Sequence, residues 1–312
     1  MSFGVTLCLV VMAAYGLTSL LLAVFVAILW VGGLDRARLK SNELLALRLF
    51  PAGAAAVLAV TVVLPAFLIY EPAHELEEGG PLLVGLAMVA LLVVGDGIRR
   101  GWRARVSTWT LSRDWGPAER RTVTAGQNVD VVDVPQPIVA VVGAWRPRII
   151  ASQCVVTACT TNEFRQVIAH EAAHIATRDN LKLLLLVLSP DMLAWLPPGA
   201  ALAARWRAAA ELEADERATG SDRHKRVALA SALIKVARLG TGMGRRRPAL
   251  IMPIAEDDVD GRVRQLLSLS PGLARAAGVW GLVPCMLLVS MIGVPFYGLV
   301  HQLIETLVAF GR

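Results

Sequence analysis

Long runs of apolar residues alternate with polar segments along this chain, and the lengths of the runs predict membrane-spanning helices. The runs cover residues 3–32, 50–70, 81–98 and 276–300. A helix needs roughly 20 residues to cross a bilayer, and the first, second and fourth runs exceed that length while the third is the shortest. The first run has no basic segment before it and is longer than the apolar core of a signal peptide, so we expect it to be retained as a helix. The pattern therefore predicts about four transmembrane helices, three within residues 1–98 and the fourth within residues 276–312.

The long segment between the third and fourth runs, residues 99–275, has the composition of a folded domain. Its first part, through Cys159, is rich in Val, Thr, Trp, Gly and Pro, which is typical of short strands and turns. From Thr161 onward Ala, Leu, Arg and Glu dominate, and the pattern becomes helical. The sequence thus predicts a mainly α membrane protein that carries one α+β domain at residues 99–275.

One further apolar segment, residues 181–203, lies inside this domain. Four residues interrupt it at short intervals: Pro190, Asp191, Pro197 and Pro198. The pieces between them are too short to cross a bilayer. We therefore expect a helical hairpin that packs in the domain or dips into the inner leaflet, not a fifth span.

The charges between the runs predict how the chain is oriented. Residues 34–48 carry four basic residues, Arg36, Arg38, Lys40 and Arg48. Residues 71–80 carry four glutamates and no Lys or Arg, and four arginines follow the third run within residues 99–105. Because cytoplasmic loops of membrane proteins are enriched in Lys and Arg, we expect the N-terminus outside and residues 99–275 in the cytoplasm.

Composition agrees with a membrane protein and excludes some functions. Apolar residues make up 55% of the chain and charged residues only 18%, against about a quarter in soluble domains. The net charge is +6, but the basic residues do not cluster with aromatic residues on a soluble face, so we expect no direct nucleic-acid binding. The four cysteines form no CxxC pair and are expected to be free thiols.

The candidate chemistry lies in "VIAHEAAHIATRD", residues 167–179. A capping box, Thr160 to Glu163, predicts that a helix begins near Asn162. His170 and His174 are then four residues apart on one helical face, a spacing that suits two ligands of a single Zn²⁺ ion. Zinc lowers the pKa of a bound water to about 7, and the neighbouring Glu171 is placed to take its proton as general base. Because short motifs also occur by chance, a third ligand is needed to decide.

A later stretch, "AAAELEADERATG" at residues 208–220, supplies that ligand. Glu211 could complete a site of two histidines and one glutamate that leaves the fourth position to water and substrate. Asp215, one turn further on, could accept the spare N–H of a ligand histidine. The alternative is that Glu211 is an ordinary surface carboxylate.

Four stretches together resemble the BlaR/MecR family of membrane zinc peptidases, whose members are gluzincins. "VIAHEAAHIATRD" resembles the family's zinc helix, including the aspartate that is Asp179 here, and "ELEADERATG" resembles its third-ligand helix. "MLAWLPPGAALAARWRAAAE" resembles the connection between those helices, and "PQPIVAVVGAWRPRIIAS" resembles the strand before the zinc helix. The four-span layout is similar as well.

The resemblance implies a gluzincin-type domain with His170, His174 and Glu211 as zinc ligands and Glu171 as catalytic base. It also implies that Asp215 and Asp179 support the ligands. A substrate-binding edge strand is implied at Ile138, Val139, Ala140, Val141 and Val142, although an ordinary buried core strand is the equal alternative. The implied output is regulatory proteolysis of a BlaI-type transcriptional repressor.

The chain departs from the family members that respond to β-lactams. They carry an extracellular penicillin-binding domain after the last span, whereas this sequence ends at Arg312 and has no Ser-x-x-Lys site on its outer side. We therefore expect the signal to enter through the spans, the short outer loops or another protein. Membrane lipids are expected partners, and a homodimer is left open.

Three alternatives also stay open. His224 could stabilise the oxyanion of a tetrahedral intermediate, but its basic neighbours favour a solvated surface residue. A quality-control peptidase of the HtpX type would share the same ligand pattern. A protein with a purely structural zinc site, acting as a sensor or scaffold, would keep the metal without catalysis.

Overall fold

The computed structural model describes residues 2–37, 39–70, 80–116, 118–240 and 258–268, together with residues 302 and 306. The fourth predicted span lies outside these described residues. The described chain divides into two compact units. The first unit contains the described residues of 2–99 and 188–204, and the second contains those of 100–187, 205–240 and 258–268. We call them the apolar-helix unit and the α+β unit.

Three helical stretches of the described chain are long and apolar enough to cross a membrane. The first is α1 (Phe3–Val31), and the third is α4 (Pro81–Asp114). The second runs from Ser41 to Tyr70 as α2 (Ser41–Leu58), a π-helical turn (Ala59–Val63) and α3 (Leu64–Tyr70). These three helices suggest a multi-pass membrane protein.

The exposed apolar side chains of these helices and the close packing between them both agree with a membrane location. Leu21, Ile28 and Leu92 point outward with 62%, 64% and 64% of their surface exposed, which lipid tolerates and water does not. Where α1 meets α4, a Cβ atom on Gly16 would lie 2.8 Å from the Cβ of Ala90. Small residues of this kind allow membrane helices to pack closely.

Two boundaries differ from those expected. The second apolar helix begins at Ser41 and not at residue 50, because the Glu43 carboxylate accepts the Lys40 backbone N–H at 2.9 Å and starts the helix within the polar segment. Pro51 therefore lies inside α2, and Arg48 belongs to a helix, not to a loop. The third helix continues to Asp114, so residues 100–114 are helical where short strands and turns were expected.

The interrupted apolar segment forms α7 (Asp179–Leu188), a 3₁₀ turn (Met192–Trp195) and the start of α8 (Pro197–Thr219). None of these is among the three candidate spans of the described chain. Residues 188–204 pack in the apolar-helix unit. Arg48 of α2 pairs there with Asp191 at 2.8 Å, and Tyr15 of α1 donates a hydrogen bond to the Pro190 carbonyl. Trp195 Nε1 donates to Asp96 of α4 at 2.9 Å, so all three apolar helices contact this turn.

The α+β unit contains one four-stranded mixed sheet among its described residues. Its strands are β1 (Arg120–Thr124), β2 (Gln127–Val132), β3 (Val139–Val142) and β4 (Arg148–Ser152). Their order is β1-β2-β4-β3, with β2 and β4 parallel and the other pairs antiparallel. The strand at residues 139–142 therefore lies at an edge of the sheet.

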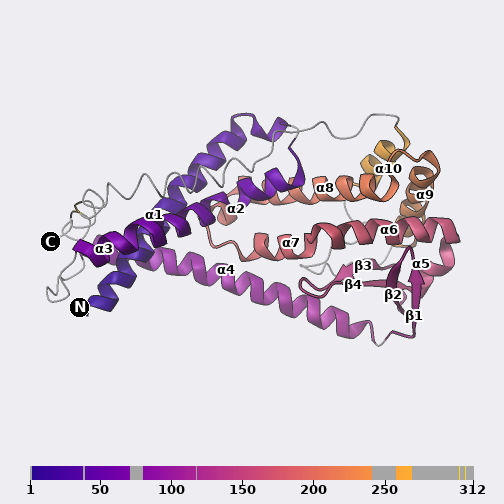
Figure 1. Ribbon diagram of the computed structural model, residues 1–312, viewed down its shortest axis with the longest axis horizontal. Helices are drawn as coiled ribbons and strands as arrows, with labels where there is room; N and C mark the ends of the chain where they lie inside the picture. The colour runs from indigo at the N-terminus through magenta and orange to yellow at the C-terminus, as the bar shows by residue number, and fades with distance from the viewer. Residues whose placement is uncertain are drawn as a thin grey trace. The chain divides into compact units, whose positions relative to one another are not determined.

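Helices cover one face of this sheet, where the main core forms. They are α5 (Gln153–Ala158), α6 (Thr161–Thr177), α9 (Arg223–Leu239) and α10 (Val259–Leu267). Figure 1 shows α6 lying along the sheet. Alternate strand residues such as Val129, Val141 and Ile149 pack with Ile168 of α6 and Leu233 of α9. Burial of this face holds α6, the helix with both histidines, in one fixed position.

Candidate metal centre

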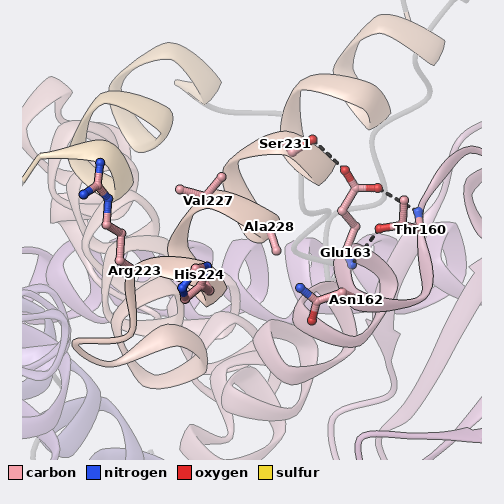
Figure 2. A pocket seen from close by; sticks show the side chains of 8 residues that line it. All are labelled: Thr160, Asn162, Glu163, Arg223, His224, Val227, Ala228 and Ser231. Carbon is pink, nitrogen blue, oxygen red and sulfur yellow. Dashed lines mark hydrogen bonds between the residues drawn. The ribbon is translucent and has the colours of Figure 1, made fainter.

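The structure of α6 follows the motif that predicted it. Thr160 caps the helix: its hydroxyl accepts the Glu163 N–H at 3.3 Å, and the Glu163 carboxylate accepts the Thr160 N–H at 2.7 Å. Figure 2 shows Glu163 held between Thr160 and Ser231 of α9. Val167 and Ile168 are fully buried in the core. The apolar residues of α6 therefore pack on the sheet, and His170 and His174, which are also buried, lie beside them on the same helix.

The three predicted ligands converge. His170 Nε2 lies 3.1 Å from His174 Nε2. Glu211 of α8 places Oε2 3.3 Å from His170 Nε2 and Oε1 3.5 Å from His174 Nε2. Ligand atoms about 2.0–2.1 Å from a tetrahedral zinc ion would be separated by roughly 3.3 Å. These buried side chains therefore form a candidate metal site whose dimensions fit zinc.

A carboxylate contacts the Nδ1 atom of each imidazole, on the side of the ring away from the metal position. His170 Nδ1 lies 2.8 Å from Asp215 Oδ1, and His174 Nδ1 lies 2.8 Å from Asp179 Oδ2. Protons on the two Nδ1 atoms leave both Nε2 lone pairs directed at the metal position. Burial lowers the pKa of each histidine, but the negative carboxylates around them, first of all Asp215 and Asp179, outweigh it, so both pKa values are raised. The carboxylates thus make both imidazoles stronger electron donors.

Glu171 has a different environment from the other carboxylates of the site. It is fully buried, and neither of its oxygens has a hydrogen-bond partner among the described residues. Burial raises the pKa of Glu171 by more than His170 and His174 lower it. Buried carboxylates are normally satisfied, so an unpaired one beside a metal site makes Glu171 a candidate functional group.

Arg262 of α10 belongs to the site and was not predicted. Its Nη1 lies 2.7 Å from Glu211 Oε2, and its Nε and Nη2 donate to the two Asp215 oxygens at 2.8 and 2.6 Å. Burial raises the pKa of Glu211, but Arg262 and the histidines hold it well below its usual range. The sequence offered no signal for this residue, because Arg262 is one of two arginines in a short amphipathic helix far from the motifs.

The remaining predicted residues lie elsewhere in the α+β unit. Val139, Ala140, Val141 and Val142 form the edge strand β3, and Ile138 directly precedes it. His224, at the start of α9, lines an open pocket of about 550 Å³ with Asn162 and Arg223 (Figure 2). His170 is eight residues beyond Asn162, or about 12 Å along α6, so this pocket lies at the N-terminal end of the helix, away from the ligand histidines. His224 is not brought together with them.

The site combines two buried histidines and one buried glutamate with a second carboxylate beside them, on an α+β scaffold. This arrangement is typical of a metallopeptidase. Residues 121–266 match the family model described as BlaR1 peptidase M56. The chain thus carries a peptidase M56 domain of the BlaR1 type, and the family predicted from the motifs is confirmed. No curated protein matches the chain.

Proposed function

We propose that this protein is a membrane-embedded zinc-dependent endopeptidase that cleaves a cytoplasmic protein in regulatory proteolysis. The convergence of His170, His174 and Glu211 beside an unpaired Glu171 carries the proposal. Family membership and the three candidate membrane helices support it. The basic residues around the apolar runs favour a cytoplasmic site.

The side chains divide the work of peptide hydrolysis. Zinc, when bound, supplies a Lewis acid that activates water and stabilises negative charge on the substrate carbonyl oxygen. Glu171 takes a proton from the attacking water and passes it to the leaving amine, and its raised pKa makes it a stronger base. Asp215 and Asp179 keep His170 and His174 in the tautomer that leaves Nε2 free.

The edge strand β3 is the proposed binding surface for the peptide. Ile138 C=O accepts Ser152 N–H at 2.8 Å and so points toward β4, whereas Val141 C=O accepts Asn180 Nδ2 at 2.8 Å and points away. Because antiparallel strands alternate in this respect, the Val139 N–H and C=O also point away from β4. Val139 is 1% exposed, so an extended substrate could pair with it only after the segment that covers this strand moves aside, while Asn180 occupies the Val141 carbonyl.

A transcriptional repressor is the proposed substrate class, which the family resemblance suggests. The test incubates purified wild type and Glu171→Gln with a purified BlaI-type repressor, and measures zinc content and cleavage together. We expect both proteins to hold zinc and only the wild type to cut the repressor at one site. An intact repressor in both samples would contradict the substrate class. Equal cleavage by both would contradict the role of Glu171, and cleavage of many misfolded membrane proteins would favour quality control.

A further inference from the structure

We infer that Arg262 is a positioning residue for the metal site: its guanidinium fork holds Glu211 and Asp215 so that the metal binds tightly. The inference rests on the proposed zinc site and goes beyond the ligands that define it. Arg262 is 3% exposed, and it contacts one oxygen of Glu211 and both oxygens of Asp215.

The two carboxylates need such a partner. Glu211 and Asp215 lie four residues apart on α8 and are 6% and 4% exposed, so two negative charges are buried on one helical face. Like charges at this spacing repel each other. Arg262 lies against both, and a bidentate guanidinium fixes the plane of a carboxylate as well as its charge. Without it, the two carboxylates would turn apart and Glu211 would lose its orientation toward the histidines.

The contact also fixes how the Glu211 carboxylate faces the two histidines, because Oε2, the oxygen that Arg262 contacts, lies 3.3 Å from His170 Nε2. Arg262 Nη1 lies against Oε2, while Oε1 faces His174 Nε2 at 3.5 Å. Asp215 in turn holds His170 through Nδ1. One arginine therefore acts on two of the three ligands, directly on Glu211 and through Asp215 on His170.

The position of Arg262 is itself well determined by α10. Asp258 caps this helix, accepting the Gly261 N–H at 3.0 Å, and Leu266 is buried in the main core. The same helix offers a matched control two residues away. Arg264 has a side chain that is 79% exposed and pairs only with the exposed Asp260 among the described residues.

The experiment uses the full-length protein in detergent and measures zinc affinity by competition with a chromophoric chelator. Partners that orient metal ligands typically change affinity by 10–100-fold, so we expect Arg262→Gln to weaken zinc binding by about that factor. Arg262→Lys keeps the charge without the fork and should lose several-fold at least, because lysine cannot replace a bidentate contact. Arg264→Gln should match the wild type.

A second readout separates positioning from folding. Co²⁺ replaces zinc as a spectroscopic probe, and its visible absorption reports the geometry of the ligands. We expect the wild-type band to be kept in Arg264→Gln and altered in Arg262→Lys. If Arg262→Gln does not fold, the zinc affinity and Co²⁺ spectrum of Arg262→Lys test the inference. A zinc affinity within twofold of wild type together with an unchanged Co²⁺ band would overturn the inference.

His170→Ala separates this inference from the proposed function. If His170→Ala binds zinc as tightly as wild type, the zinc site itself is wrong. If His170→Ala loses zinc but both Arg262 variants keep wild-type affinity and spectrum, only the role of Arg262 is wrong.

Discussion

The buried ion pair between Arg48 and Asp191 can be tested by removing one charge at a time. Arg48 lies in α2 and is 3% exposed, and Asp191 lies in the turn before α8 and is fully buried. Arg48 Nη1 contacts the two Asp191 oxygens at 3.0 and 2.8 Å. Breaking a buried pair by removing one partner typically costs about 3–5 kcal/mol, because the other charge is left buried and uncompensated.

The contacts predict that the two single substitutions are not equal. After Arg48→Met, the Asp191 carboxylate still accepts the Ala194 N–H at 3.1 Å and the Ser189 hydroxyl, so the cost should lie near 3 kcal/mol. After Asp191→Asn, the buried Arg48 guanidinium keeps only neutral partners among the described residues, the new amide oxygen and the Ser189 hydroxyl at 3.4 Å, and has no counter-charge there, so the cost should lie near 5 kcal/mol. The double variant Arg48→Met/Asp191→Asn leaves no buried charge without a partner, so its loss of stability should be smaller than the sum of the two single losses.

Thermal unfolding in detergent measures these differences. At about 2–4 °C per kcal/mol, Arg48→Met should lower Tm by roughly 6–12 °C and Asp191→Asn by more. Arg103→Met, which changes an exposed arginine of α4, is the control and should have little effect. The reasoning would be refuted if Arg48→Met behaved like this control, or if the two single effects added without interaction.

Three further predictions test other parts of the structure. Burial raises the pKa of Glu163, but hydrogen bonds from Lys235, Ser231 and Thr160 lower it from 4.5 to about 2. Above pH 4.5 the wild type should therefore be more stable than Glu163→Gln by about 1–3 kcal/mol. This difference in stability should disappear as the pH falls through 2 and the carboxylate is protonated. Chemical unfolding from pH 7 to pH 2 checks this, and a constant difference would contradict it. Asp179→Asn should weaken zinc binding by about 10-fold or more in chelator competition, because the amide that replaces the Asp179 carboxylate is not a charged acceptor for the His174 Nδ1–H. Unchanged zinc affinity would show that Asp179 does not orient His174. Gly16→Leu should separate α1 from α4 and lower Tm, because a Cβ at Gly16 already lies 2.8 Å from Ala90, whereas Gly4→Leu, with nothing within 4 Å, should be tolerated.

The sequence by itself determined the features that depend on neighbouring residues. The capping box placed the start of the zinc helix to within one residue, because Thr160 and Glu163 interact across a single turn. The i, i+4 spacing put His170 and His174 on one face, because helix geometry fixes that relation. The three apolar stretches were recognised from their length, since a bilayer requires a minimum number of apolar residues.

Only the tertiary structure decided the features that join distant segments. Arg262 reaches Glu211 and Asp215 from a helix about 50 residues further along the chain, and nothing in its local sequence marks it. Arg48 was counted as a loop charge, but it is buried because Asp191, 143 residues away, neutralises it. The helix after residue 98 extends to Asp114 although its composition suggested turns. Ion pairs and burial of this kind depend on which side chains the fold brings into contact, and a local pattern contains no record of that contact.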